Sequence, residues 1–288
     1  MPAMVRGSCL CDAIAWQAEG PLELMSHCHC SMCRKSHGTA FATYLAGKSD
    51  GFAWLRGREH VRRYQSSPGF DRPFCPTCGS VVAGGVDNGY VFMPAGCLDD
   101  DPGARPTAHV FVASNPPWHA ITGELPRFDV CPPGWPSTEI LRDDPPEALP
   151  GCFGGSCLCN AVAYSVRARP DAIINCHCSR CRKARSAAHA SNLFVPPEAF
   201  RWTRGEEFVE RYRVPDAARF THCFCRTCGS SLPRRTDDDV MIPAGSLDHD
   251  PGARERMHIH VDSMAPWYAI TDALPQHPQG PGSGDVTV

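Results

Sequence analysis

The apolar positions of this chain fall in short runs with strand-like spacing. Apolar and polar residues alternate in "AIAWQA" (residues 13–18) and in "AVAYSV" (residues 161–166), and a period of two predicts half-buried strands. β-branched or aromatic runs at residues 41–46, 90–95 and 109–114 also predict strands, with Gly, Pro and Asp between them. We therefore expect a mainly β protein with few short helices.

One repeated segment has the spacing of a helix. "CSMCRK" (residues 30–35) and "CSRCRK" (residues 178–183) each place cysteines at positions i and i+3, which are neighbours on one helical face. No run of 18 apolar residues occurs, and the first residues lack the apolar stretch of a secretory signal. These features predict a cytoplasmic protein that does not bind membranes.

The chain is a tandem repeat. "GSCLCDAIAW" (residues 7–16) matches "GSCLCNAVAY" (residues 155–164), and "MPAGCLDDDPGAR" (residues 93–105) matches "IPAGSLDHDPGAR" (residues 242–254). Each copy is a complete unit, so we expect the two to pack as a pseudo-symmetric pair that imitates a homodimer. The predicted organisation is a first domain at 1–130, a proline-rich linker at 131–152, a second domain at 153–277 and a flexible tail at 278–288.

Composition points to metal rather than to nucleic acid. The 288 residues carry a formal charge of -3 and no long basic run, so the chain lacks the positive field that nucleic acid binding requires. Eighteen cysteines are present, and a cytoplasmic chain keeps its thiols reduced. Because they cluster in CxC and CxxC units, these cysteines predict metal sites rather than disulfides.

Four of the seven repeated cysteines fit a closed site. Two zinc-bound sulfurs lie about 3.8 Å apart, whereas side chains at i and i+2 of a straight strand are about 7 Å apart, so each CxC must turn. Asp12 and Asn160 follow it and tolerate left-handed backbone, and Gly79 and Gly229 follow the CxxC. Joining CxC to the distant CxxC closes a long loop. The predicted structural zinc ligands are Cys9, Cys11, Cys75 and Cys78, with Cys157, Cys159, Cys225 and Cys228.

Three cysteines per copy remain, and they predict an open metal site. A catalytic zinc site keeps three protein ligands and leaves the fourth position free. The alternative is a closed site with His29 or His177 as fourth ligand. Cys97, whose counterpart is Ser246, is expected to be a small core or surface residue. The predicted catalytic metal ligands are Cys28, Cys30 and Cys33, with Cys176, Cys178 and Cys181.

Five motifs in order resemble those of the GFA family, the glutathione-dependent formaldehyde-activating enzymes, which includes the centromere protein V type. In the first copy they are "GSCLCDAIAW", "CHCSMCRKSHG", "RPFCPTCGS", "AGCLDDDP" and "PPWHAITGELP". The resemblance implies a β-rich Mss4-like (β-tent) fold, two zinc ions per domain and four per chain. It also implies a carbon-sulfur lyase-type activity, the condensation of glutathione with formaldehyde to S-hydroxymethylglutathione.

Two further features concern the substrate. Arg34 and Lys35, repeated as Arg182 and Lys183, are candidates to bind glutathione carboxylates or, alternatively, to offset the charge of the thiolates. The second copy reads "RKARS" for "RKSHG" and has His222 for Arg72, which predicts a weaker or different substrate site there. Alternatives to the glutathione reaction are a non-catalytic zinc-stabilised binding module and a lyase for another small thiol or aldehyde.

Overall fold

The structure is a computed structural model that describes residues 4–22, 24–87, 89–133, 148 and 150–280. We call residues 4–133 the first half and residues 150–280 the second half. The predicted mainly β class with few short helices is confirmed, because each half has one α-helix and many short strands. Most of the predicted linker and of the predicted tail, residues 134–147, 149 and 281–288, lies outside the described residues.

The first half contains the helix α1 (Ser31–His37). Its strands are β1 (Met4–Ser8), β2 (Ala15–Glu19), β3 (Leu24–Cys28), β4 (Ala42–Lys48), β5 (Phe52–Arg56), β6 (Arg62–Ser67), β7 (Phe70–Phe74), β8 (Gly84–Asp87), β9 (Tyr90–Pro94), β10 (His109–Val110) and β11 (Arg127–Phe128). Its 3-10 helices are η1 (Ser49–Gly51), η2 (Arg58–His60), η3 (Ala95–Cys97) and η4 (Val112–Ser114).

The second half contains the helix α2 (Ser179–Arg185). Its strands are β12 (Phe153–Ser156), β13 (Ala163–Val166), β14 (Ile173–Cys176), β15 (Ala190–Val195), β16 (Phe200–Arg204), β17 (Val209–Arg213), β18 (Thr221–Cys225), β19 (Ser231–Leu232), β20 (Arg234–Arg235), β21 (Val240–Pro243), β22 (Glu255–Ile259) and β23 (Gln276–His277). Its 3-10 helices are η5 (Pro197–Ala199), η6 (Glu206–Phe208), η7 (Ala244–Ser246) and η8 (Val261–Ser263).

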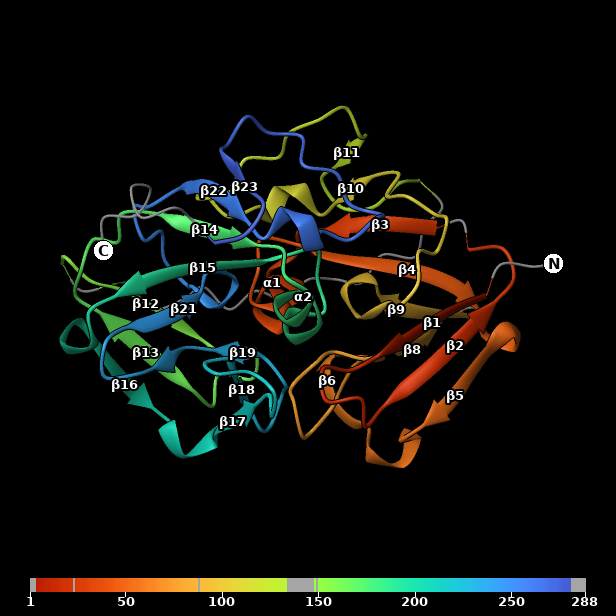
Figure 1. Cartoon of the computed structure of the whole chain (residues 1–288), viewed down its shortest axis with the longest axis horizontal. Coiled ribbons are helices and arrows are strands. Elements are labelled where there is room, and N and C mark those ends of the chain that lie inside the picture. The colour runs from red at the N-terminus through yellow and green to blue at the C-terminus, as the bar shows by residue number, and fades with distance from the viewer. Residues whose placement is uncertain (1–3, 23, 88, 134–147, 149, 281–288) are drawn as a thin grey trace.

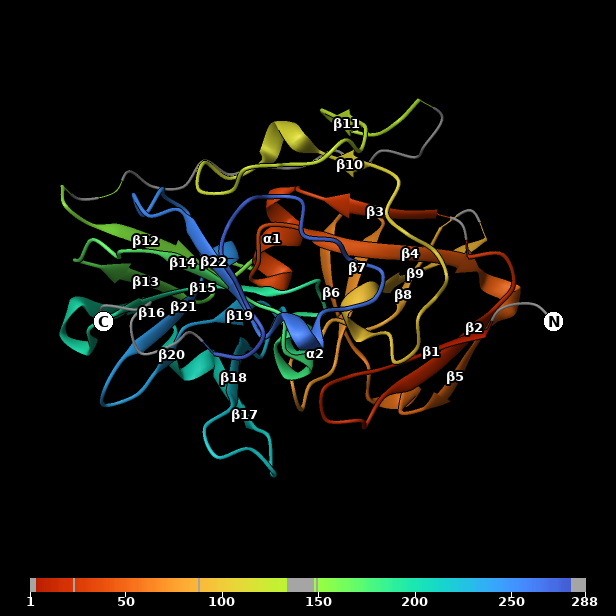
Figure 2. The ribbon, with the colours of Figure 1, turned by 45° about the horizontal axis from the view of Figure 1, so that its top comes forward.

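The two halves have the same sheet plan. A six-stranded sheet runs in the order β11-β10-β3-β4-β9-β8 in the first half and β20-β21-β15-β14-β22-β23 in the second. A three-stranded antiparallel sheet, β1-β2-β5 or β12-β13-β16, lies below it in the view of Figure 1. The two six-stranded sheets lie on either side of the middle of the molecule, and α1 and α2 both lie near that middle (Figures 1 and 2).

The sequence pattern located most of these elements. The alternating runs form β2 and β13, and the segments that begin with Cys30 and Cys178 form α1 and α2. The strand predicted over residues 109–114 is wrong beyond Val110, because Phe111 takes φ 57° and a 3-10 helix follows. No helix among the described residues has the length and apolar character needed to cross a membrane.

The two halves pack closely around an approximate two-fold axis. Thr122 and Thr271 occupy equivalent positions, and their hydroxyls lie 2.5 Å apart. The 3-10 helix η7 of the second half packs against α1, and η3 of the first half packs against α2. A Cβ on Gly245 in η7 would overlap the backbone of Thr39, and a Cβ on Gly96 in η3 would overlap that of Ala187. Glycine at these positions is therefore what permits the close approach.

Candidate metal centres at the four cysteine groups

Two groups of four cysteine sulfurs form where the sequence places the closed sites. The sulfurs of each group all lie within 4.8 Å of one another. Cys9 and Cys11 Sγ are 3.5 Å apart, and Cys157 and Cys159 Sγ are 3.4 Å apart. These spacings are close to the roughly 3.8 Å expected around a tetrahedral zinc ion. Both groups could therefore hold a metal ion, and an all-sulfur donor set suits zinc.

The predicted turn after each CxC is confirmed. Asp12 and Asn160 have φ of 61° and 59°, and Gly79 and Gly229 have φ of 76° and 74°. The left-handed residue directs the chain back, so that Ile14 N donates to Cys9 Sγ at 3.4 Å. Backbone donors of this kind stabilise negative charge on the sulfur.

Two groups of three sulfurs form at the ends of the helices. Cys28 ends β3, Cys30 is the N-cap of α1 and Cys33 lies in its first turn; Cys176, Cys178 and Cys181 repeat this arrangement. Cys30 Sγ accepts from Cys33 N at 3.3 Å. Hydrogen bonds with Cys28 and Cys33 lower the pKa of the Cys30 thiol well below its usual value. The equivalent bonds lower the pKa of Cys178 to about 2, so each group has one sulfur poised as thiolate.

The histidines of the CHC motifs face away from these groups. His29 Nε2 lies 2.9 Å from His109 Nδ1, and His177 Nε2 lies 2.8 Å from His258 Nδ1. Burial, with the charge of neighbouring histidines, lowers the pKa of His29 to about 3. Among the described residues, neither three-sulfur group gains a histidine or carboxylate ligand. The arrangement thus favours open sites over closure by His29 or His177.

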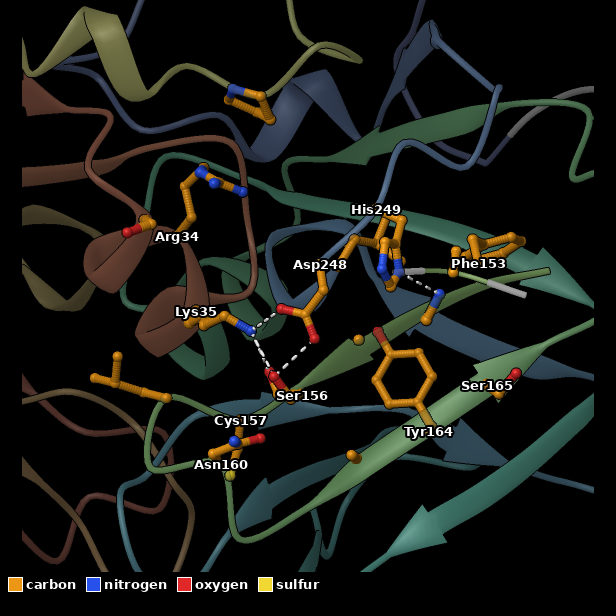
Figure 3. Close-up of a pocket in the computed structure, with 18 of the residues that line it drawn as sticks. Arg34, Lys35, Phe153, Ser156, Cys157, Asn160, Tyr164, Ser165, Asp248 and His249 are labelled. Atoms are coloured by element: carbon orange, nitrogen blue, oxygen red, sulfur yellow. Dashed lines mark hydrogen bonds and ion pairs between the residues drawn. The ribbon is translucent and has the colours of Figure 1, made fainter. Parts of the chain in front are cut away.

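The lysines after each cysteine group cross to the opposite half. Lys35 Nζ donates to Ser156 O at 2.9 Å and to Asp248 Oδ1 at 2.5 Å, which Figure 3 shows in a close-up. Lys183 Nζ forms the reciprocal ion pair with Asp99 at 2.5 Å. These contacts favour a structural role for both lysines at the boundary between the halves. The sequence gives no sign that Asp99 and Asp248 pair with these lysines, since nothing local indicates a partner so distant along the chain.

The arginines next to these lysines lie differently. Arg34 lines a cavity of about 650 Å³ between the halves, together with Lys35, Ser156 and Asp248 (Figure 3). Arg182 is half-buried, and burial lowers its pKa. The predicted role of both arginines in binding glutathione stays a prediction.

A larger cavity reaches the second three-sulfur group. It measures about 750 Å³ and is lined by Cys176 and Cys181 together with Arg185, Asn192 and His222. This volume is in the range of small-molecule sites. An opening of this kind beside two of the three sulfurs is what an open metal site needs in order to receive a substrate.

The chain matches a known family model in both halves. The model of the glutathione-dependent formaldehyde-activating enzymes matches residues 4–114 and 152–263. The chain belongs to this family. The two matched segments confirm two tandem copies of this family's domain, while the boundaries predicted at residues 130 and 153 stay predictions.

Individual relatives agree with the family. A protein of Halomonas elongata, provisionally named a glutathione-dependent formaldehyde-activating enzyme, is 30% identical over 157 residues, which cover 48% of this chain and 93% of the relative. An uncharacterised lyase of Schizosaccharomyces pombe is 31% identical over 83 residues, 29% of this chain and 58% of the relative. A solved Rhodobacter sphaeroides protein is 27% identical and covers 34% of this chain and 89% of its own, with a TM-score of 0.26 that is too low to support an argument about fold.

Cys131 interacts with the first three-sulfur group, and the sequence pattern did not single it out. Cys131 is half-buried at the end of the described first half, and Val130 O accepts from Phe111 N at 2.7 Å. Burial and the charge of Cys30 raise the pKa of the Cys131 thiol. Its counterpart in the second half is Gly280, so only the first half has a thiol at this position. Comparing the two copies does not point to Cys131, because no cysteine stands at the equivalent position of the second copy.

Proposed function

We propose that the chain is a zinc-dependent carbon-sulfur lyase-type enzyme that condenses glutathione with formaldehyde to S-hydroxymethylglutathione. The observation that carries this proposal is the three-sulfur group of each half, which has no fourth histidine or carboxylate ligand among the described residues. Membership of the family and the lyase name of one relative support it.

We assign zinc to all four cysteine groups. The four-sulfur groups would hold structural ions, because four thiolates complete a tetrahedral shell. The three-sulfur groups would hold the catalytic ions through Cys28, Cys30 and Cys33 and through their counterparts in the second half. A zinc ion bound there supplies a Lewis acid that favours the thiolate form of an added thiol.

The chain itself positions and shields the reacting groups. The first three-sulfur group packs against Met32, Phe111 and Leu158, and the last of these comes from the second half. This apolar surrounding excludes water, which strengthens electrostatic interactions at the site. Arg72 places its Nη1 3.7 Å from Cys33 Sγ, and its positive charge favours an anion beside the sulfurs.

The reaction needs no redox partner. The glutathione thiol loses its proton, its sulfur adds to the carbonyl carbon of formaldehyde, and one carbon-sulfur bond forms. The electron pair of the broken carbon-oxygen π bond takes up a proton, which gives a hydroxyl group. In reverse, the carbon-sulfur bond breaks and formaldehyde leaves. Bringing the two reactants together at a fixed site is the main contribution expected of the protein.

Cys131 raises a second candidate function for the first half, although its Sγ lies outside the group formed by Cys28, Cys30 and Cys33. If this thiol closes the first three-sulfur group, that half is a zinc-stabilised binding module without chemistry. A Cys131→Ser variant separates the two functions. An enzyme with an open site binds glutathione equally well with and without Cys131, whereas a closed site begins to bind glutathione only in the variant.

Cobalt substitution gives the direct test of thiol binding. We expect glutathione to change the sulfur-to-cobalt charge-transfer spectrum of the cobalt-loaded protein, because a further sulfur joins the three of each open group. An unchanged spectrum across the titration contradicts the proposed function. Parallel titrations with other small thiols, and assays with other aldehydes, decide whether glutathione and formaldehyde are the preferred substrates.

A further inference from the structure

Each three-cysteine group lies near a buried arginine that has no carboxylate partner. Arg72 is 5% exposed and Arg185 is 3% exposed. Within the described part of the chain, neither forms an ion pair with an aspartate or a glutamate. A buried charge without a counter-charge is costly, so the negative charge that balances each guanidinium is to be sought among the cysteine sulfurs.

The two arginines come from different positions of the repeat. Arg72 lies on β7, and the equivalent residue on β18 is His222; Arg185 ends α2, and the equivalent residue of α1 is His37. At these two positions the copies therefore differ by one exchange: the arginine and the histidine have changed places. In the second half Arg185 and His222 line the same cavity. Burial and the charge of Arg185 lower the pKa of His222 to about 4, and burial and the charge of Arg72 lower that of His37 to about 4.

A third position changes with the exchange. In the first half, Tyr44 OH lies 2.9 Å from His37 Nε2. In the second half, Asn192 takes the place of Tyr44, and its Oδ1 accepts from Arg185 Nη2 at 3.2 Å. The shorter amide accommodates the longer guanidinium on the helix. The three positions thus differ together between the halves, and each half keeps one buried arginine, attached at a different point of the fold.

Arg72 contacts a sulfur of its group directly, and Arg185 lines the cavity that reaches two sulfurs of the other group. Arg72 Nη1 lies 3.7 Å from Cys33 Sγ. Arg185 lines the same cavity as Cys176 and Cys181, and its Nη1 has no hydrogen-bond partner among the described residues. This Nη1 is buried beside Gly38 of the first half, so Arg185 acts on the cavity through the charge of its guanidinium.

We propose that Arg72 and Arg185 stabilise an incoming thiolate at the three-cysteine group of their own half, and that the second half therefore binds thiols as the first half does. This inference rests on the proposed function. Zinc with three thiolates carries one net negative charge, which opposes the approach of a further anion. One adjacent guanidinium cancels that charge, so the fourth sulfur can bind as thiolate.

The test uses full-length protein in which one three-cysteine group at a time is disabled. Cys178→Ser leaves the first half to report, and Cys30→Ser leaves the second. In the Cys178→Ser background, Arg72→His, Arg72→Lys and the exchange variant His37→Arg/Arg72→His are compared. Glutathione affinity is measured by cobalt charge-transfer absorbance, and zinc retention is measured by competition with a chelator.

We expect Arg72→His to weaken glutathione binding about tenfold, the loss of one charge-assisted hydrogen bond, and to release zinc to the chelator faster. Arg72→Lys and the exchange variant should return within about threefold of the parent, because both restore the charge. In the Cys30→Ser background, Arg185→His should weaken binding, and Arg185→His/His222→Arg should restore it. Arg105→His, an exposed arginine paired with Asp101, is the matched control and should change nothing.

Two results overturn the inference. One is glutathione binding and zinc retention by Arg72→His at the level of the parent. The other is an exchange variant or an Arg72→Lys variant as impaired as Arg72→His, which would show that charge is not the property that matters. If neither parent binds glutathione, the proposed function fails, and zinc retention alone then judges the role of the arginines.

Discussion

The reciprocal lysine contacts between the halves give a quantitative prediction. In Lys35→Met, Asp248 loses its ion pair, and the Ser156 carbonyl loses a donor. The side chains of Lys35 and Asp248 are only 18% and 14% exposed, so solvent screens the pair weakly. Hydrogen bonds to charged groups contribute about 1.5–3 kcal/mol, and we expect a loss of about 2 kcal/mol in the free energy of unfolding.

The second pair should matter less. The side chains of Lys183 and Asp99 are 23% and 32% exposed, and more exposed pairs contribute about 1 kcal/mol or less. With an unfolding entropy of about 2.1 cal/mol/K per residue and 288 residues, Lys35→Met should lower the Tm by about 3 °C. Lys183→Met should lower it by half of that or less, if the chain unfolds as one unit.

Calorimetry of zinc-saturated protein measures both effects, and a double-mutant cycle with Asp248→Asn isolates the pair. The losses in Lys35→Met and Asp248→Asn should be strongly non-additive. Glutathione affinity should be unchanged in Lys35→Met. The reasoning is refuted if Lys35→Met keeps the parental Tm and loses about tenfold in glutathione affinity, since the lysine would then bind substrate instead of joining the halves.

Three further predictions concern the interface, the metal and pH. Gly245→Ala should lower the free energy of unfolding, measured in urea, by about 3 kcal/mol, because the added Cβ meets the backbone of the first half. Gly280→Ala, which places no atom near its Cβ, should leave that free energy almost unchanged. Cys9→Ser should lose about one zinc ion per chain by elemental analysis, whereas Cys97→Ser should lose none. Burial lowers the pKa of His37 to about 4 from 6.5, so the unfolded state binds more protons than the folded state between these two pH values. The contribution of His37 to the free energy of unfolding is therefore full above pH 6.5 and is lost as the pH falls toward 4. His37→Gln should therefore flatten the fall of the unfolding free energy with pH, and an unchanged slope contradicts this assignment.

Local chemistry made much of the metal sites predictable. The need of a CxC unit to turn predicted left-handed backbone after it, and Asp12 and Asn160 adopt that conformation. Cysteines at i and i+3 predicted the helix that Cys30 caps. These features depend on a few neighbouring residues, so their geometry follows from spacing alone.

Contacts between the halves were not predictable in the same way. In the sequence, the changes from His37 to Arg185 and from Arg72 to His222 are two unrelated differences between the copies, and they predict a weaker or different second site. Only the fold brings the two positions of each copy together beside the sulfurs. Likewise, nothing near Lys35 in the sequence points to Asp248, because that pairing depends on how two finished domains dock.

The most direct test of the account is exchange spectroscopy on a mixture of glutathione and formaldehyde. Zinc-loaded protein should accelerate the interconversion of the free reactants and S-hydroxymethylglutathione, and a Cys30→Ala/Cys178→Ala variant that keeps its four-cysteine zinc sites should return the rate to that of the spontaneous reaction. Equal exchange rates with the parent, with the variant and without protein would contradict the claim that the three-cysteine groups are catalytic.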